Sequence, residues 1–305
     1  MKDYNMILPG QVRVVEVGPR DGFQNQPPIL TEIKYQIIAG MIEAGVKEME
    51  ITSFVSPKAI PQMADAKELA ARVVGQYGEK AGLRLIALVP NLKGAQAALE
   101  SGLKTVSYVI SASERHSLEN VRKTTAESFE GLKQLLRELP QLFVRLDIAT
   151  AFGCPFLGSV PEENVLKLAA EAAEAGVGEI ILCDTIGVGN PLQVYSLAQK
   201  ARGIGVPMGL HLHDTRGLGL ANTLAGLQAG VAMFETSVAA LGGCPFAPGA
   251  SGNTATEDLL NMLTSLGLAT GISMERYLQA VDLVIKEVLP TAGGHLAKAP
   301  LKPCC

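Results

Sequence analysis

The stretch 206-VPMGLHLHDTRGLGLAN-222 carries one complete strand-to-helix transition, and it decides the class of fold. Its apolar first half predicts a buried strand, and an Ala/Leu-rich helix begins after Gly217 and Gly219. Because side chains alternate along a strand, His211 and His213 project from one face, about 7 Å apart. This pair lies where a strand ends and a helix begins, which is the active edge of α/β folds. The spacing suits two ligands of one metal ion.

Histidines on a strand can equally be structural residues, and a metal site needs more than two ligands. The chain has only four histidines, and Asp214 directly follows this pair. That concentration favours a metal site, for which the rest of the chain must supply the other ligands.

The same strand-then-helix pattern recurs along the 305 residues. Small motifs such as Ala44-Gly45-Val46 and Ala229-Gly230-Val231 each end a helix and begin a strand. The Gly-x-Gly-x-x-Gly motif that marks a dinucleotide-binding fold does not follow the first strand. We therefore predict an α/β fold, a closed (β/α)8 TIM barrel, with strands at 12–17, 47–52, 83–89, 105–110, 143–149, 179–183, 207–213 and 232–237.

The expected barrel covers about residues 12–270, and an additional C-terminal helix and flexible tail cover about 271–305. No linker divides the chain, so we expect a single catalytic domain over 1–305. Residues 18–22 read as a turn after the first strand. The terminal helix has an apolar stripe that suits either a homodimer contact or packing against its own barrel.

Composition limits the classes of partner. The formal net charge is −4 and basic residues are scattered, which disfavours nucleic-acid binding. No apolar run approaches the length of a membrane span, so we expect a cytoplasmic protein without membrane contact. The five cysteines form neither a disulfide framework nor a Cys-x-x-Cys zinc pattern. Cys154 and Cys183 suit a core, Cys244 lies in an accessible Gly/Pro-rich loop, and Cys304 and Cys305 are expected in a loose tail.

Polar residues at the ends of the predicted strands should converge on one mouth of the barrel. A carboxylate from Asp21, the two imidazoles and one further oxygen would give a mixed nitrogen and oxygen site. Such a site suits Mg²⁺ or Mn²⁺, and also iron, cobalt or zinc. With Arg20 beside it, the site favours a substrate that passes through an enolate. The converging residues are Arg20, Asp21, Glu50, Thr52, Ser53, Asp147, Thr150, Asp184, Thr185, His211, His213 and Ser237.

Six segments together resemble the hydroxymethylglutaryl-CoA lyase family, in order, from about residue 12 to 290. The loop 242-GGCPFAPGASGN-253 is the most diagnostic of them. Arg20, Asp21 and Glu50 also match the wider superfamily of aldol and Claisen metallo-enzyme barrels. The other segments are 16-EVGPRDG-22, 53-SFVSPK-58, 90-PNLKG-94, 184-DTIGVG-189 and 211-HLHDT-215.

The resemblance implies retro-Claisen cleavage of 3-hydroxy-3-methylglutaryl-CoA into acetyl-CoA and acetoacetate, a step of leucine breakdown. The partner would be an acyl-CoA, and the cofactor a divalent metal, Mg²⁺ or Mn²⁺. The implied metal ligands are Asp21, His211, His213 and Asn253.

The resemblance also implies catalytic roles. Arg20 would stabilise the thioester oxygen, and Cys244 would deliver a proton to the enolate carbon or act through a bound water. Glu50 would orient Arg20 or the oxygens on the metal. The group that removes the proton of the substrate's hydroxyl could be His211, Asp184 or a water on the metal, and the resemblance does not decide among them.

Some positions depart from the family pattern, namely Arg216, Phe23 and residues 150–156. By the resemblance, these positions are expected to surround the acyl group. A lyase for longer 3-hydroxy-3-alkylglutaryl-CoA esters or for citramalyl-CoA is therefore the nearest alternative. A Claisen-condensing synthase of the same superfamily is less well supported, because Gly-Gly-Cys-Pro replaces its Gly-Glu-Arg type of loop. A non-catalytic binding barrel is disfavoured by the set of candidate catalytic residues.

Overall fold

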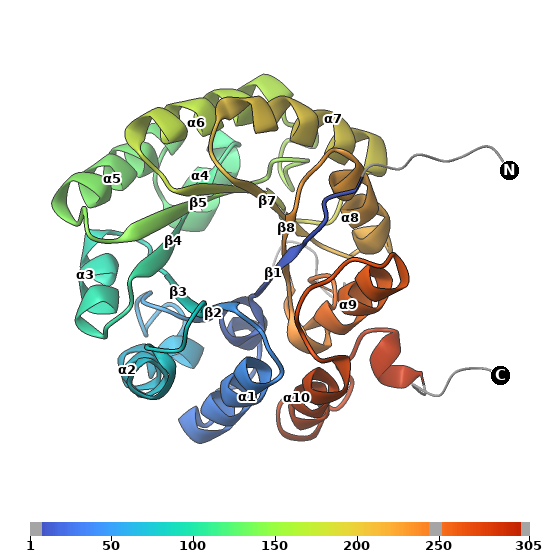
Figure 1. Cartoon of the computed structure of the whole chain (residues 1–305). Coiled ribbons are helices and arrows are strands. Elements are labelled where there is room, and N and C mark those ends of the chain that lie inside the picture. The colour runs from blue at the N-terminus through green and yellow to red at the C-terminus, as the bar shows by residue number, and fades with distance from the viewer. Residues whose placement is uncertain (1–7, 244–251, 300–305) are drawn as a thin grey trace, which may run out of the picture.

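Eight parallel strands close into a barrel in the computed structural model, which describes residues 8–243 and 252–299 (Figure 1). Each strand pairs with the next along the chain, and β8 pairs with β1 to complete the ring. The predicted TIM barrel is thus confirmed. The strands are β1 (Arg13–Glu16), β2 (Glu48–Ser53), β3 (Arg84–Leu88), β4 (Thr105–Ser111), β5 (Phe143–Ala149), β6 (Glu179–Asp184), β7 (Met208–Leu212) and β8 (Met233–Thr236).

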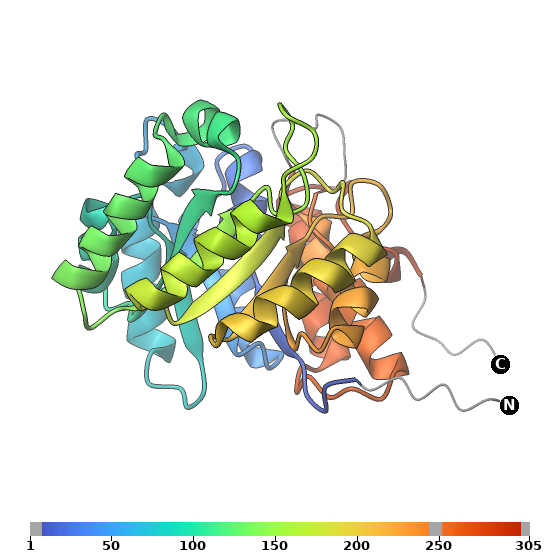
Figure 2. The ribbon, with the colours of Figure 1, turned by 90° about the horizontal axis from the view of Figure 1, so that it is seen from above.

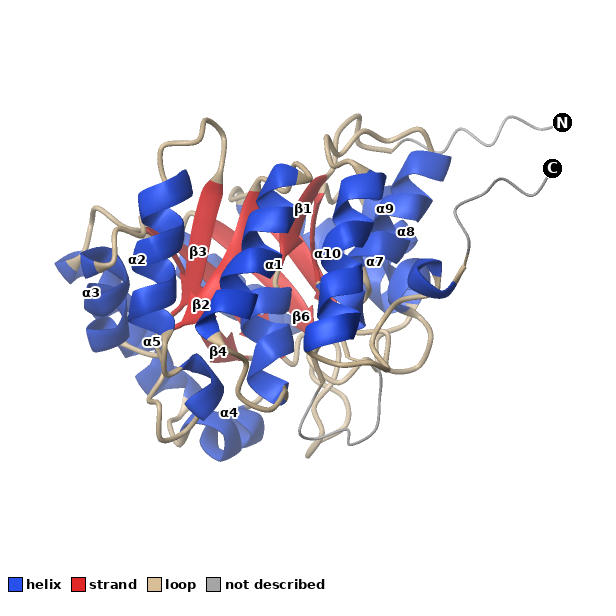
Figure 3. Cartoon of the chain, turned by 90° about the horizontal axis from the view of Figure 1, so that it is seen from below, coloured by secondary structure: helices blue, strands red, loops and turns tan. Residues whose placement is uncertain are grey.

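Helices surround the strands on the outside (Figures 1 and 3). Two of them, α4 and α5, connect β4 to β5, and α4 and the loop after β5 stand on the same rim (Figure 2). None of the described helices has the length and hydropathy needed to cross a membrane. The helices are α1 (Thr31–Glu43), α2 (Ala66–Tyr77), α3 (Leu92–Glu100), α4 (Glu114–Val121), α5 (Thr125–Glu138), α6 (Glu162–Ala175), α7 (Pro191–Ala201), α8 (Gly219–Gln228), α9 (Thr256–Ser265) and α10 (Met274–Glu287).

The terminal helix α10 lies between α9 and α1 and completes the ring of helices (Figure 1). Its apolar side chains Tyr277, Ala280, Val281 and Val284 are buried. Of the two uses open for its apolar stripe, the structure therefore shows packing against its own barrel.

The interior of the barrel is partly apolar and partly charged. Val15, Ile86, Ile181 and Met233 form a small apolar cluster within it. Arg145 of β5 is fully buried, and it donates hydrogen bonds to Glu179 of β6 and Glu235 of β8. Buried charges are tolerated when they are paired in this way.

Residues 18–22 form a short π-helical segment, η1 (Gly18–Gly22), where the sequence suggested a simple turn. Close packing leaves no room for a side chain at either glycine of this segment. A Cβ on Gly18 would lie 2.7 Å from the Val238 side chain, and one on Gly22 would lie 2.7 Å from the Leu241 side chain. Single π-helical turns are rare and often mark functional sites. This one packs the loop after β1 directly against the loop after β8.

A fully buried carboxylate, Glu16, ties these two loops together. It accepts hydrogen bonds from the backbone N–H groups of Gly18 and Val238, both at 2.8 Å, and from the hydroxyls of Thr256 and Tyr277. Helices α9 and α10 are thereby connected to the segment that carries Arg20 and Asp21. No sequence pattern indicated this link, because Val238, Thr256 and Tyr277 lie more than 200 residues from Glu16.

Two consecutive alanines after β8 adopt left-handed backbone conformations, Ala239 at φ 56° and Ala240 at φ 53°. The turn is held by hydrogen bonds from Ala239 N–H to Glu257 and from Gly293 N–H to the Ala239 carbonyl. For residues other than glycine this conformation is strained. The strain lies immediately before the diagnostic glycine-rich loop.

We expect Ala240→Gly to raise the free energy of unfolding by about 0.5–1 kcal/mol, because relief of the strain exceeds the added entropy of the unfolded chain. Urea unfolding measures the change. The matched control Ala173→Gly, inside helix α6, is expected to lower the free energy of unfolding by about 1 kcal/mol. Equal destabilisation by both variants would contradict the assignment of strain to residue 240.

Candidate metal centre and catalytic site

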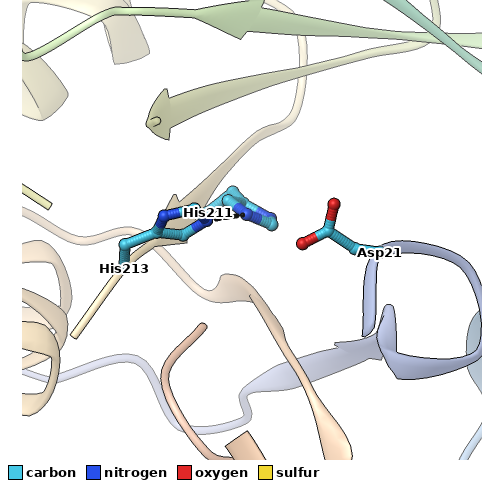
Figure 4. Close-up of side chains that lie close together, drawn as sticks. All are labelled: Asp21, His211 and His213. Carbon is cyan, nitrogen blue, oxygen red and sulfur yellow. Dashed lines mark hydrogen bonds between the residues drawn. The ribbon is translucent and has the colours of Figure 1, made fainter. Parts of the chain in front are cut away.

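Asp21, His211 and His213 form a compact buried cluster at the carboxyl ends of the strands. Their potential ligand atoms all lie within 4.8 Å of one another. Figure 4 shows the Asp21 carboxylate facing the two imidazoles. His211 belongs to β7, whereas His213 lies one residue past the end of that strand and forms a bridge with Asn253. The two Nε2 atoms are 3.1 Å apart.

Asn253 lies against the same cluster. Its Nδ2 donates to Asp21 Oδ2 at 2.6 Å and to the carbonyl of Leu241 at 3.0 Å. Its Oδ1 is buried and has no hydrogen-bond partner within the described residues. An unpartnered buried amide oxygen beside a carboxylate and two imidazoles is a suitable further ligand for a divalent cation.

The electrostatics of the cluster also suit a cation. Burial and the neighbouring His211 lower the pKa of His213 to about 3, so its imidazole stays neutral. Burial opposes ionisation of Asp21, but Arg20 and the two histidines hold the pKa of its carboxyl below the usual value. One neutral imidazole and one carboxylate are therefore ready as ligands.

The pKa of His211 is shifted in the opposite direction from that of His213. Burial opposes its charged form, but Glu235 and Asp21 raise the pKa of His211 above the usual value. A proton on its Nε2 can then be donated to the neutral Nε2 of His213. Metal binding at this pair would release that proton.

Arg20 is fixed beside the cluster by two acidic side chains. Its Nε donates to Glu50 Oε2 at 2.6 Å, and its Nη1 donates to Asp21 Oδ1 at 2.5 Å. Arg20 is only 7% exposed and Glu50 is fully buried. The other Glu50 oxygen has no hydrogen-bond partner among the described residues. The structure thus brings together Arg20, Asp21 and Glu50, as the sequence suggested.

Glu235 is a site residue that the sequence reasoning missed. Its Oε2 lies 3.0 Å from His211 Nδ1, and its Oε1 accepts a hydrogen bond from Arg145 at 2.6 Å. Although burial opposes ionisation, Arg145 first and His211 next hold the pKa of Glu235 at about 2. An ionised Glu235 keeps the Nδ1 proton of His211 in place and leaves Nε2 toward the cluster. An acidic residue inside the apolar strand 233–236 was the only signal for it in the sequence.

We expect Glu235→Gln to weaken Mn²⁺ binding about 10- to 100-fold, because the ring of His211 loses its charged acceptor. Isothermal titration calorimetry measures the affinity. The control is Glu179→Gln, which alters the other partner of Arg145 without touching His211. An equal loss in both variants would show that only the general charge balance of the barrel matters.

Asp184 lies apart from the cluster contacts. Its two oxygens accept backbone hydrogen bonds from Val188 and Gly189, both at 3.0 Å, and so organise the loop after β6. Burial raises the pKa of this carboxyl. Asp214, which follows the histidines, accepts a hydrogen bond from the N–H of Gly219, the first residue of helix α8, at 2.7 Å.

The diagnostic loop begins and ends at the cluster. A Cβ on Gly242, at φ 124°, would lie 2.3 Å from Asn253 Nδ2 and 3.2 Å from Asp21 Oδ2. Glycine is therefore required at the edge of the site. Cys244 lies outside the described residues, as do Cys304 and Cys305. Cys154 and Cys183 are buried.

The family model described as HMGL-like matches residues 11–284. The chain belongs to this family. The resemblance found in the sequence is thus confirmed. The hydroxymethylglutaryl-CoA lyase of Bacillus subtilis is 42% identical over 284 residues, 92% of this chain and 94% of that protein.

Two further similar proteins extend the comparison. The mitochondrial hydroxymethylglutaryl-CoA lyase of Rattus norvegicus is 42% identical over 301 residues, 97% of this chain and 91% of that protein. A solved structure of an HMG-CoA lyase from Acinetobacter baumannii, in complex with coenzyme A and 3-methylmalate, has a TM-score of 0.91 and 36% identity. It covers 100% of this chain and 99% of that chain.

Proposed function

We propose that this protein is a metal-dependent carbon–carbon lyase that cleaves 3-hydroxy-3-methylglutaryl-CoA into acetyl-CoA and acetoacetate, as in leucine breakdown. One observation carries the proposal: Asp21, His211 and His213 converge within 4.8 Å, and Arg20 contacts the same Asp21 carboxylate. Membership of the HMGL-like family supports it.

We propose Asp21, His211, His213 and Asn253 as the residues that hold the divalent metal, with Mg²⁺ or Mn²⁺ as the ion. The donor set of carboxylate, imidazole and amide oxygen supports this choice, because Mg²⁺ and Mn²⁺ prefer oxygen and nitrogen to sulfur. When bound, such a cation lowers the pKa of a coordinated hydroxyl group and polarises substrate oxygens.

Arg20 is the proposed electrostatic stabiliser. Carbon–carbon cleavage leaves the electron pair on the acetyl-CoA fragment as an enolate, whose negative oxygen needs a positive partner. The bonds to Glu50 and Asp21 hold the guanidinium in one orientation. The proposed role of Glu50 is therefore to position Arg20.

The base must take the proton of the tertiary hydroxyl. Of the two side chains considered, Asp184 already accepts two backbone hydrogen bonds, whereas His211 faces the cluster through Nε2. Since the Nδ1 of His211 faces Glu235 and its Nε2 is also proposed to hold the metal, the general base stays open among His211, Asp184 and a water. Cys244 is proposed to return a proton to the enolate carbon, directly or through a water.

A second substrate is supported by one specific observation. The related structure from Acinetobacter baumannii holds coenzyme A together with 3-methylmalate, a hydroxy diacid shorter than the hydroxymethylglutaryl group. A citramalyl-CoA type of substrate, or a longer 3-hydroxy-3-alkylglutaryl-CoA, would undergo the same reaction in the same site. These esters are the alternatives to 3-hydroxy-3-methylglutaryl-CoA.

The substrate is tested with purified enzyme, Mg²⁺ and dithiothreitol. Each acyl-CoA is supplied in turn, and acetyl-CoA and the released oxo acid are followed. The proposal expects acetoacetate from 3-hydroxy-3-methylglutaryl-CoA at the highest kcat/KM. Higher kcat/KM with citramalyl-CoA would move the assignment to that ester. Release of free CoA from acetyl-CoA and a 2-oxo acid would instead indicate a synthase.

Three broader proposals accompany this function. The chain forms one catalytic domain over 1–305, since strands and helices from both halves make one barrel. It acts as a homodimer, which light scattering of the purified protein tests. It acts in the cytoplasm, which fractionation of the source cells tests.

A further inference from the structure

Acidic and basic side chains fill the barrel interior around the candidate site. Glu50, Asp147, Glu235, Arg20 and Arg145 are among them, and each is at most 7% exposed. Three carboxyl groups thus lie near two guanidinium groups in a buried part of the barrel. Not all three carboxyls can be ionised at low cost in such a place.

The two arginines are committed to the other carboxylates. Arg20 binds Glu50 and Asp21, and Arg145 binds Glu235 and Glu179. Asp147, by contrast, keeps a buried Oδ1 without a hydrogen-bond partner in the part of the chain that the structure describes. A buried polar atom without a partner destabilises a fold unless something else supplies the partner.

The strand places Asp147 toward the site. Arg145 projects into the barrel, since it reaches Glu179 and Glu235 on other strands. Asp147 is two residues further along β5 and therefore projects from the same face, one step closer to the carboxyl ends of the strands. Leu146, between them, belongs to the outer apolar core. Asp147 thus lies between the Arg145 layer and the mouth that carries Asp21.

The surroundings of Asp147 favour its neutral form. Burial first, and then Glu235 and Glu50, raise the pKa of its carboxyl well above the usual value, and Arg145 and Arg20 only partly oppose this. The thiol of Cys183, on β6, also has its pKa raised and contributes no charge. A protonated carboxyl is both a donor and an acceptor of hydrogen bonds.

We propose that Asp147 is a substrate-binding residue that donates a hydrogen bond to an oxygen of the acyl group, and that it helps to select the acyl group. The inference rests on the proposed function and deepens it. The substrates considered carry a carboxylate as well as a hydroxyl. A neutral Asp147 attracts such an oxygen, whereas an ionised one would repel it. The ligand class is therefore a hydroxy-carboxylate acyl ester.

Two substitutions separate the hydrogen bond from the shape of the side chain. Asp147→Leu removes the donor, and we expect kcat/KM for 3-hydroxy-3-methylglutaryl-CoA to fall about 10- to 100-fold, mainly through KM. Asp147→Asn keeps an N–H donor, so its loss should be smaller. The ratio of kcat/KM between 3-hydroxy-3-methylglutaryl-CoA and citramalyl-CoA should change in both. The control Ser107→Ala alters another buried neighbour of Arg145 and should change neither value.

The pH profile gives a second readout. As pH rises, ionisation of Asp147 should lower kcat/KM of the wild type at the alkaline end. The amide of Asp147→Asn cannot ionise, so this part of the decline should disappear. Thermal unfolding verifies that each variant is folded; replacing an unpartnered buried carboxyl by leucine should not lower the melting temperature.

Infrared difference spectroscopy tests the contact without turnover. The wild-type minus Asp147→Asn difference spectrum should contain the C=O band of one protonated carboxyl, and this band should shift when 3-hydroxy-3-methylglutarate and CoA are added together. An unmoved band, with wild-type kcat/KM in Asp147→Leu, would overturn the inference. If the wild type cleaves none of the esters, the proposed function fails, and the band still decides whether Asp147 contacts a hydroxy-carboxylate.

Discussion

Replacing His213 with alanine is expected to abolish tight binding of Mn²⁺ and to lower kcat by roughly three orders of magnitude or more. A bound cation contributes several kcal/mol of transition-state stabilisation, and that contribution is lost with the ligand. His213 is suited to this role because it is 6% exposed, and its Nε2 lies 3.1 Å from that of His211. Calorimetry with Mn²⁺ and steady-state kinetics measure the two effects.

The control for this experiment is His295→Ala, because the His295 side chain is largely exposed and pairs with Asp258 away from the cluster. It should retain both metal affinity and turnover. Wild-type affinity for Mn²⁺ in a folded His213→Ala protein would remove this residue from the metal centre.

Arg20→Gln is expected to lower kcat by about 10²- to 10³-fold, with little change in Mn²⁺ affinity. The glutamine side chain cannot supply the positive charge that the enolate oxygen requires. Arg20→Lys should restore only part of the rate, because the ammonium group cannot contact Glu50 and Asp21 with the same fixed geometry. Single-turnover kinetics, combined with calorimetry, separate the chemical step from metal binding.

Arg72→Gln is the matched control, since Arg72 pairs with Glu32 on the surface. Its kinetics should equal those of the wild type. If Arg20→Gln kept a normal kcat and instead lost Mn²⁺ binding, the arginine would serve only to arrange Asp21.

The barrel was predictable because its signal is local and repeated. Strands such as Glu179–Asp184 contain a short apolar run and are followed by a turn and a helix, and eight such repeats are compatible with few topologies. The strand boundaries differ from the prediction by one residue at most. His211 and His213 could likewise be placed on one face from the alternation of side chains alone.

Contacts between distant segments could not be predicted in this way. Asn253 and Asp21 are 232 residues apart, and only closure of the barrel brings their side chains together. Glu235 lies next to His211 because of the register between β7 and β8, which the sequence does not determine. For the same reason, the unpartnered state of Asp147 is visible only once its neighbours on other strands are known.

The π-helical conformation of residues 18–22 could not be predicted from the sequence either. Gly18 and Gly22 indicate a turn, but they do not show the π-helical form or the close packing against Val238 and Leu241, which follow β8. That packing holds the segment that carries Arg20 and Asp21 against the loop after β8.

The most direct test of the account is acetoacetate formation from 3-hydroxy-3-methylglutaryl-CoA by chelator-treated enzyme that is titrated with Mn²⁺. The account predicts no cleavage at first, a rise that saturates near one ion per chain, and no rise in His213→Ala. Full activity of the folded, chelated enzyme would contradict the metal centre. No cleavage by the metal-loaded wild type would contradict the assigned substrate.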